Sequence, residues 1–287
     1  MAWCGSATRS ATADVLGPPE DASFEVLKRQ LIALTGWDLG RFKEAYLRRR
    51  VATRVRSTQS ADWAAYGVLL RSDPAELERL RDRLTVNVTE FFRDPDFWQV
   101  LDRDVLPELV EAADGRPRRE LRLWSAGCSS GEEPYTLALL ALRAVRASGL
   151  PVRVHVMASD IDAVILAKAR DGRYSAEAIR LLPTALRQDA FVPDGAQWKV
   201  SPAVRDAVAF RSLDLFSSPP PPDLDLVLCR NVMIYFSRDL QQRLLRAFHQ
   251  ALRPGGYFAT GKTETVLGPV RGAFQCASAT ARIFQRA

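Results

Sequence analysis

The hydrophobic pattern is clearest in the middle of the chain. Leu121–Trp124 is a short apolar run of the kind that forms a buried strand, and a turn of small residues follows it. The tripeptide Glu132–Pro134 then opens a segment whose apolar residues, from Leu137 to Val145, recur at helical spacing. A strand, a glycine turn and a helix predict the first βα unit of an open α/β sheet. Such sheets bind ligands beyond the carboxyl ends of their strands.

The same alternation continues to the end of the chain. Further strands are predicted at Val152–Met157, Val208–Leu213, Leu224–Cys229, Tyr257–Gly261 and Ala281–Gln285, with helices at Ala163–Arg170 and Asp239–Leu252. Residues 172–204 interrupt the alternation, and the Asp194-Gly195 pair inside them is a hairpin signal. The pattern therefore predicts an α/β domain with a small inserted subdomain.

Residues 23–84 have helical periodicity throughout, and the helix predicted at residues 40–57 is strongly basic. Its arginines face a single acid, Glu44, so ion pairs one turn apart cannot neutralise it. A solvated face is the plain interpretation; we favour a docking surface for an acidic polymer or protein. The candidate docking residues are Arg41, Arg48, Arg49, Arg50, Arg54 and Arg56.

Composition narrows the class of protein. A net charge of +6 fits an acidic partner without naming one. No apolar run approaches the ~20 residues that a membrane span needs, and residues 1–17 are small and polar, with no signal-peptide core. The four cysteines, Cys4, Cys128, Cys229 and Cys276, form no close pair. We therefore expect no disulfide framework and no metal site, and a reducing cytoplasm as the location.

The turn after Trp124 does not suit a phosphate, because it lacks both the P-loop lysine and the dinucleotide glycine spacing. It offers the bare backbone of Gly127 and Gly131 beside the carboxylates of Glu132 and Glu133. Such a site suits a ligand with a positive end, such as the amino group and sulfonium of S-adenosylmethionine. The alternative is an ordinary tight turn whose acids stabilise the helix dipole.

Two further segments could complete a nucleoside site. Asp160 and Asp162 follow the second strand, where a carboxylate holds a ribose diol, although one of them could instead cap the next helix. Asn87, Thr89 and Arg93 lie just before the α/β domain, where they could close a pocket mouth or simply join two helices.

Four motifs stand in a fixed order. They are Asn87–Arg93 (N-x-T-x-F-F-R), Trp124–Tyr135 (W-S-A-G-C-S-x-G-E-E-P-Y), Ala158–Asp162 (A-S-D-I-D) and Cys229–Phe236 (C-R-N-V-M-I-Y-F). With a basic helical domain ahead of them, the chain closely resembles the CheR-type chemotaxis receptor methyltransferases from about Ser23 onward. These enzymes methylate receptor glutamates with S-adenosylmethionine and release S-adenosylhomocysteine.

The resemblance implies a fold and a domain plan. The expected fold is α/β, a Rossmann-like class I methyltransferase sheet with helices on both faces, preceded by a small all-helical domain and carrying a small inserted β-subdomain. The expected parts are a disordered tail (1–22), a basic receptor-docking domain (23–84), a linker and cofactor-capping segment (85–117) and the methyltransferase domain (118–287), with its insertion at 172–204. The implied enzyme is a cytoplasmic, monomeric bacterial protein-glutamate O-methyltransferase. Its implied partner is the acidic helical methylation region of chemoreceptors, with no nucleic acid and no membrane insertion.

Matched position by position, the family's functional residues carry over to this chain. The expected cofactor-binding residues are Asn87, Thr89, Arg93, Gly127, Glu133, Asp160, Asp214, Leu215, Asn231 and Val232, and the catalytic candidates are Arg93 and Tyr235. Glu133 is expected to take the methionine amino group and Asp160 the ribose hydroxyls. Arg93 would orient a carboxylate of the cofactor or the substrate. Tyr235 would line the methyl passage by cation–π attraction, or serve only as a structural wedge.

Two departures from the family pattern matter. The position of Asp214 is usually Asn, and a carboxylate cannot donate to a ring nitrogen of adenine. The predicted hairpin turn, Pro193–Gln197, lacks the longer glycine-rich turn of members that grip a receptor's C-terminal pentapeptide. We therefore expect a pentapeptide-independent enzyme.

The implied reaction needs no general base, because a glutamate with a pKa of about 4.3 is already ionised at neutral pH. His155 lies in a strand pattern and His249 in a helix pattern, so both are expected to be structural. Two other functions are alternatives. A nucleic-acid methyltransferase would also be basic, but Asn231–Ile234 does not match the N/D-P-P-Y/F/W motif of amino methylases, and the basic domain lacks interleaved aromatics. The matched site residues argue against a non-catalytic signalling adaptor.

Overall fold

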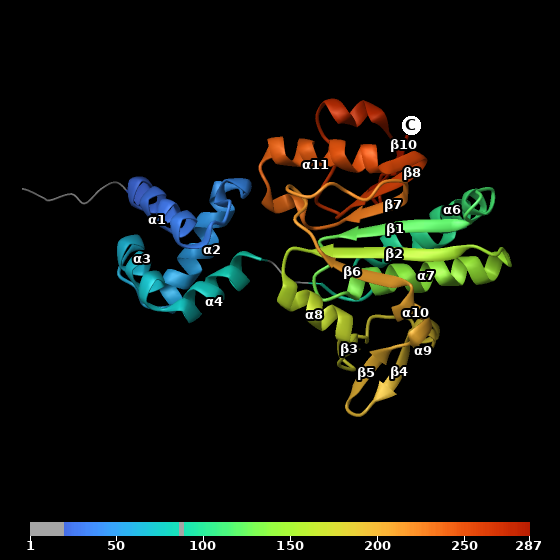
Figure 1. Ribbon diagram of the computed structural model, residues 1–287, viewed down its shortest axis with the longest axis horizontal. Helices are drawn as coiled ribbons and strands as arrows, with labels where there is room; N and C mark the ends of the chain where they lie inside the picture. Colours follow the sequence, from blue (N-terminus) through green and yellow to red (C-terminus); the bar gives the residue numbers. More distant parts are fainter. Residues whose placement is uncertain (1–19, 86–88) are drawn as a thin grey trace, which may run out of the picture. The chain divides into compact units, whose positions relative to one another are not determined.

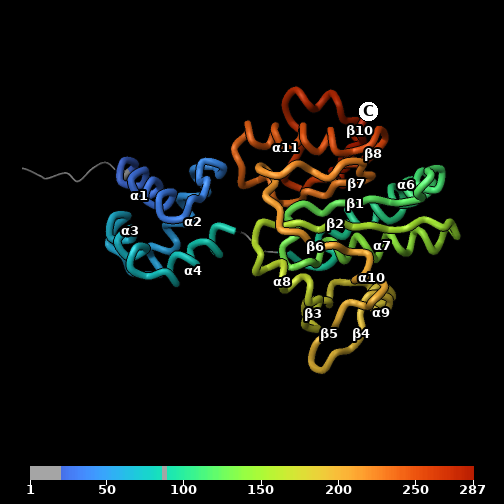
Figure 2. The backbone as a smooth tube through the Cα atoms, viewed as in Figure 1, coloured from blue at the N-terminus to red at the C-terminus, as the bar shows by residue number. Residues whose placement is uncertain are grey.

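The computed structural model describes residues 20–85 and 89–287, which form two compact units (Figures 1 and 2). The first unit is helical and ends at Leu84. The second runs from Thr85 to Ala287 and also includes the short segment Arg41–Lys43. None of the helices within these described ranges has the length and apolar character required to cross a bilayer.

Residues 20–85 form four α-helices and a short 3-10 turn. They are α1 (Glu20–Thr35), η1 (Leu39–Arg41), α2 (Glu44–Ser57), α3 (Trp63–Ser72) and α4 (Pro74–Leu84). Asp62 caps α3 by accepting the Ala65 amide over 2.7 Å. The second helix was predicted to begin at Gly40 but begins at Glu44, because Phe42 leaves the helix and forms a β-bridge within the second unit.

A buried acid, Glu76, holds three of these helices together, since its side chain is only 1% exposed. Its carboxylate accepts from the Arg54 guanidinium at 2.9 and 2.6 Å, from Arg79 at 2.8 Å and from the Tyr66 hydroxyl at 2.8 Å. Burial alone would raise the pKa of Glu76, but the hydrogen bonds from these partners outweigh it and lower the pKa to about 2. Arg54, a predicted docking residue, is therefore committed to an internal ion pair.

The second unit is organised by a seven-stranded sheet in the order β6-β2-β1-β7-β8-β10-β9. The strands are β1 (Glu120–Ala126), β2 (Arg153–Asp160), β6 (Val208–Ser212), β7 (Leu224–Cys229), β8 (Leu252–Thr260), β9 (Phe274–Ser278) and β10 (Ile283–Arg286). The first five strands in spatial order are parallel to one another. Strand β10 runs antiparallel to both of its neighbours, β8 and β9. The carboxyl ends of β1, β2 and β7 therefore meet at one edge.

Helices cover both faces of this sheet (Figure 1). The helical elements are α5 (Pro95–Val100), the π-helical η2 (Leu101–Val105), α6 (Leu106–Asp114), α7 (Glu132–Ser148), α8 (Ala163–Asp171), η3 (Met233–Tyr235), α11 (Arg238–Ala251) and η4 (Pro269–Ala273). Leu123 and Val156 pack on the α6–α7 side, and Trp124 and Phe258 pack on the α11 side. Because successive strand residues point to opposite faces, nearly continuous apolar strands such as β7 are buried on both sides.

The insertion between β2 and β6 forms its own small sheet, visible in Figure 2 as a lobe beside α10. It contains β3 (Arg173–Tyr174), α9 (Thr184–Ala190), β4 (Phe191–Asp194), β5 (Gln197–Val200) and α10 (Pro202–Asp206). The strand order is β3-β5-β4, and the β4–β5 hairpin closes through two residues, with Gly195 at a φ of +61°. The predicted fold class, including the helical domain and the inserted β-subdomain, is confirmed.

The Glu76 cluster generates a stability prediction. Glu76→Gln should lower the free energy of unfolding by about 2–4 kcal/mol, because it leaves Arg54 half-buried without a counter-charge. The pKa of Glu76 is depressed, so its contribution is present above the unfolded value of 4.5 and is lost as the pH falls toward about 2. Calorimetric unfolding across this range checks both. The control is Glu78→Gln, whose carboxylate pairs with Arg81 on the surface and should change stability by under about 0.5 kcal/mol.

Candidate active site

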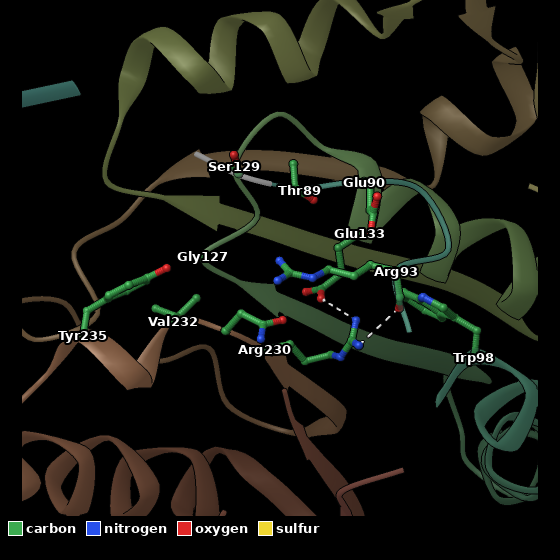
Figure 3. Close-up of a pocket in the computed structure, with 11 residues that line it drawn as sticks. Thr89, Glu90, Arg93, Trp98, Gly127, Ser129, Glu133, Arg230, Val232 and Tyr235 are labelled. Carbon is green, nitrogen blue, oxygen red and sulfur yellow. Dashed lines mark hydrogen bonds and ion pairs between the residues drawn. The ribbon is translucent and has the colours of Figure 1, made fainter. Parts of the chain in front are cut away.

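A pocket lies at the carboxyl edge of the sheet, between the ends of β1 and β7 (Figure 3). Its lining comes from five places: the segment before α5, α5 itself, the turn after β1, the first turn of α7 and the segment after β7. The lining residues are Thr89, Glu90, Arg93, Trp98, Gly127, Ser129, Glu133, Arg230, Asn231, Val232 and Tyr235.

The turn after β1 presents bare backbone to this pocket. Gly127 has a φ of +83°, and a Cβ atom there would lie 2.5 Å from a methyl carbon of Val232. Any larger residue would therefore be strained and would collide with the segment after β7. The Ser129 amide donates to the Asp160 carboxylate over 2.9 Å, which ties this turn to the end of β2.

A buried guanidinium, that of Arg230, connects three parts of the site. It donates to Glu133 over 3.3 Å and to Asp94 over 2.7 Å, and a second bond from the same nitrogen as the Asp94 contact reaches the Arg93 carbonyl (Figure 3). The Arg230 side chain is 2% exposed and lies 4.1 Å from the ring centre of Phe97. A charge buried this deeply is tolerated because it is paired on two sides.

The turn after β7 is held by a second buried acid, Glu264. Its carboxylate accepts the amides of Asn231 (2.7 Å), Gly261 (2.7 Å) and Ile234 (3.0 Å). Asn231 has a φ of +61°, a strained conformation for a residue with a side chain. Glu264 thus fixes the backbone that places Asn231, Val232 and Tyr235 at the pocket.

Two adjacent phenylalanines anchor the segment before α5. The Phe91 ring packs edge-on against Tyr174 and Phe191 of the inserted subdomain, at centroid distances of 4.7 and 5.2 Å. The Phe92 ring stacks on Trp98 at 6.2 Å. With both rings buried, the neighbouring Arg93 is kept at the pocket wall.

Burial changes the pKa values of the acids in the site. It raises the pKa of the Glu133 carboxyl, an effect that the nearby Arg230 charge and the Ser125 hydroxyl only partly oppose. It also raises the pKa of Asp160, against hydrogen bonds from the Asp162 and Ser129 amides. A positive ligand group would relieve both carboxylates, so these acids favour a cation.

Most of the predicted site residues come together here. Those that line the pocket are Thr89, Arg93, Gly127, Glu133, Asn231, Val232 and Tyr235. Asp160 lies beside it through the Ser129 amide, whereas Asp162 caps α8 by accepting the Val164 and Ile165 amides. Asn87 lies outside the described residues.

Asp214 and Leu215 follow β6 and are not among the residues that line the pocket. The Asp214 carboxylate instead binds Arg41, with Arg41 Nη1 lying 2.7 and 2.6 Å from its two oxygens. Arg41, predicted to dock a substrate, thus has an internal partner.

Sequence reasoning assigned no role to Arg230, Glu264 or Trp98. For Arg230 a signal existed, because an arginine that directly follows a largely apolar strand must find a buried counter-charge. Glu264 and Trp98 carry no comparable signal, since Glu264 binds backbone amides about thirty residues earlier and the Trp98 ring contacts Arg230, far away in the sequence.

Comparison with known proteins identifies the family. Residues 87–283 match the model of the CheR methyltransferase SAM-binding domain, and residues 22–85 match that of the CheR methyltransferase all-alpha domain. The chain belongs to the CheR methyltransferase family. The resemblance seen in the sequence is confirmed, and the protein is an S-adenosylmethionine-dependent methyltransferase.

Relatives extend over most of the chain. A chemotaxis protein methyltransferase of Listeria monocytogenes is 34% identical over 244 residues, covering 85% of this chain and 88% of that protein. Chemotaxis protein methyltransferase 2 of Pseudomonas aeruginosa is 34% identical over 249 residues, with 84% and 85% covered. A 104.1 kDa protein of Rhodobacter capsulatus is 36% identical over 245 residues, which is 85% of this chain but a quarter of that protein.

The pocket fits S-adenosylmethionine in three physical respects. The bare turn at Gly127 lets a ligand lie against the backbone, and buried Glu133 offers a negative partner for its positive end. In addition, Trp98 Nε1 and Arg230 Nε are buried with no hydrogen-bond partner among the described residues, so ligand acceptors could satisfy them.

These acids generate a binding prediction. Glu133→Gln should weaken binding of S-adenosylhomocysteine about 10- to 100-fold, because it removes a buried charged acceptor. As the pH falls below neutrality, wild-type affinity should decrease more steeply than that of the variant, since burial raises the pKa of Glu133 and its carboxylate therefore protonates at a higher pH than an exposed glutamate does. Titration calorimetry measures both.

The matched control for this prediction is Glu132→Gln. The Glu132 carboxylate accepts from the Ser130 hydroxyl and does not line the pocket, so its removal should leave affinity within about threefold. Equal losses of affinity in the two variants would show that Glu133 does not bind the ligand.

Proposed function

We propose that this enzyme transfers the methyl group of S-adenosylmethionine to glutamate side chains in the cytoplasmic domains of chemoreceptors, forming methyl esters in chemotaxis adaptation. The observation that carries the proposal is a pocket with buried acids beside bare backbone, in a chain of the CheR methyltransferase family. The enzyme acts in the cytoplasm, because that is where receptor methylation regions lie. It acts as a monomer.

Different residues of the pocket bind different parts of the cofactor. Glu133 takes the methionine amino group and Asp160 the ribose hydroxyls, each a carboxylate facing donors. Arg93 orients a carboxylate at the pocket wall, and Tyr235 lines the methyl passage with its ring. Thr89, Asn231 and Val232 complete the lining.

When bound, the cofactor supplies a methyl group on a sulfonium, which a carboxylate oxygen takes as the carbon–sulfur bond breaks, leaving S-adenosylhomocysteine. A glutamate is ionised at neutral pH, so no residue of the chain needs to remove a proton. The chain therefore contributes alignment and exclusion of water, for which effective molarities reach roughly 10⁵ M or more.

The basic face of α2 recruits the substrate. Arg49 and Arg56 are exposed and have no carboxylate partner within residues 20–85 and 89–287, and Arg50 lies over the Tyr46 ring. Arg48 pairs with two exposed acids, Asp21 and Glu44, so a stronger acidic partner can displace them. These arginines suit an acidic helix of the receptor methylation region; Arg41 and Arg54 are left out because their partners are internal.

The enzyme acts without binding a receptor tail pentapeptide. The β4–β5 hairpin closes through the two-residue loop Gly195–Ala196, with Asp194 opposite Gln197, and so offers little surface beyond its own strands. Neither a nucleic-acid methyltransferase nor a non-catalytic adaptor is favoured, since the Listeria monocytogenes and Pseudomonas aeruginosa relatives, which match most of the chain, are chemotaxis protein methyltransferases.

The reaction can be identified by its product. With S-adenosylmethionine carrying a tritiated methyl group, label should enter the cytoplasmic domains of receptors, and mild alkali should then release it as methanol. Glutamyl methyl esters hydrolyse in base, whereas N-methyl products do not. Label that survives alkali, or that enters tRNA or DNA instead, would contradict the proposal.

The docking surface generates a separate prediction. Arg49→Glu and Arg56→Glu should each raise the KM for receptor about fivefold, with unchanged kcat at saturation, because each replaces an attractive surface charge with a repulsive one. The wild-type KM should also rise with salt, as surface charges are screened within ~8 Å. Arg71→Glu, an exposed arginine on α3, is the matched control. An equal rise in that variant would mean that net charge alone matters.

A further inference from the structure

The segment Arg41–Lys43 packs against the turn that carries Tyr235. The Lys43 amide donates to the Tyr235 carbonyl over 2.8 Å. Two residues further along the chain, the Ser237 amide donates to the Arg41 carbonyl over 3.2 Å. These two bonds flank Phe236, so the backbone that directly follows Tyr235 is fixed by a segment from far away in the sequence.

Aromatic rings also pack between the Arg41–Lys43 segment and the turn that carries Tyr235. Phe42 forms an isolated antiparallel bridge with Phe236, and their ring centres lie 6.0 Å apart. Phe236 packs edge-on against Phe216 at 4.8 Å. The Arg41 guanidinium lies 5.1 Å from the Phe216 ring centre, so one apolar cluster joins the segment to the loop after β6.

All the hydrogen-bond acceptor positions of the Asp214 carboxylate are occupied in this arrangement. One oxygen accepts from Arg41 Nη1 at 2.7 Å and from the Phe216 amide at 2.9 Å. The other accepts from Arg41 Nη1 at 2.6 Å and from the Ser217 hydroxyl at 2.7 Å. A carboxylate has about four acceptor sites, so none is left for an adenine amine.

Electrostatics agree with this geometry. Burial raises the pKa of Asp214, but the Arg41, Phe216 and Ser217 hydrogen bonds outweigh it, so the net shift is downward. Asp214 is therefore a carboxylate at neutral pH and pairs with Arg41 as an ion. An asparagine at this position would present an amide with half the acceptors and no charge.

We propose that Arg41 and Asp214 form a clasp that positions Tyr235 for methyl transfer, and that Asp214 does not contact adenine. Arg41 and Asp214 are positioning residues, acting through the Arg41–Lys43 segment on a tyrosine that lines the pocket. Because in-line transfer depends steeply on alignment, a loosened clasp lowers kcat while leaving cofactor affinity almost unchanged.

A double-mutant cycle tests the clasp. The proteins are wild type, Arg41→Ala, Asp214→Ala and the double variant, with Arg41→Lys as the conservative change and Arg103→Ala as the control. Arg103 is exposed and pairs with its neighbour Asp104. The measurements are kcat, the KM values for S-adenosylmethionine and receptor, and S-adenosylhomocysteine affinity by calorimetry.

Each single alanine variant should lower kcat about tenfold, and the double variant should be no worse than either, since both remove the same interaction. Affinity for S-adenosylhomocysteine should stay within about threefold. Arg41→Lys should retain most activity, because a single nitrogen of Arg41 reaches both oxygens of Asp214.

Three results would overturn the clasp. If Asp214→Ala weakens S-adenosylhomocysteine binding more than about tenfold and Arg41→Ala does not, Asp214 is an adenine ligand. If Arg41→Ala raises only the receptor KM, Arg41 is a docking residue. If the kcat losses of the two variants multiply in the double variant, the residues act independently.

The kinetic measurements rest on the proposed function, so a second readout is independent of it. Hydrogen–deuterium exchange at the Lys43 and Ser237 amides should be faster in Arg41→Ala and Asp214→Ala than in Arg103→Ala, because both amides bond across the clasped segment. Absence of methyl transfer by the wild-type enzyme would count against the proposed function alone. Equal exchange in all three variants would count against the clasp alone.

Discussion

One buried charge, the guanidinium of Arg230, determines how the site is assembled. An unpaired cation in this interior would cost several kcal/mol, so the chain must bring it two carboxylates. Glu133 comes from the first turn of α7 and Asp94 from the segment before α5, and both meet the arginine at the end of β7. Three segments that are distant in sequence are thus fixed relative to one another by a single side chain. The pocket that they surround exists because that pairing has to be satisfied.

The other acids around the pocket follow the same rule with backbone donors. Asp160 accepts amides from Ser129 and Asp162, and Glu264 accepts three amides from the turns after β7 and β8. Directional hydrogen bonds from backbone amides hold the oxygens of these carboxylates in position. A site of this kind is negative and already organised before a ligand arrives. A cation entering it requires little rearrangement, which is the condition under which fixed charges are most effective.

The α/β alternation and the inserted hairpin could be predicted because each rests on local signals: apolar runs, helical periodicity and an Asp-Gly pair. The edge strand β9, Phe274–Ser278, was missed because three of its five residues are exposed and it carries no apolar run. β8 begins five residues earlier than predicted, at Leu252, since pairing with β7 extends the strand through Pro254 and two glycines. The motif residues converge on one pocket, as strand-end residues of a parallel sheet should. What the sequence could not reveal is pairing at long range, such as Arg54 with Glu76 or Arg41 with Asp214.

These pairings change how the positive charge of the chain should be understood. In a reaction whose nucleophile is already ionised, the protein gains nothing from a base and much from alignment and dryness. Some arginines therefore serve the scaffold: Arg230 holds the pocket, and Arg54 holds the helical unit. Others, such as Arg49 and Arg56, remain at the surface, where their attraction is weak and sensitive to salt. If α2 docks the substrate as proposed, buried pairs set the geometry of the site and surface charges set affinity for the substrate, so the two can change separately. Substitutions on α2 would then change substrate recognition without disturbing the atoms that carry out the transfer.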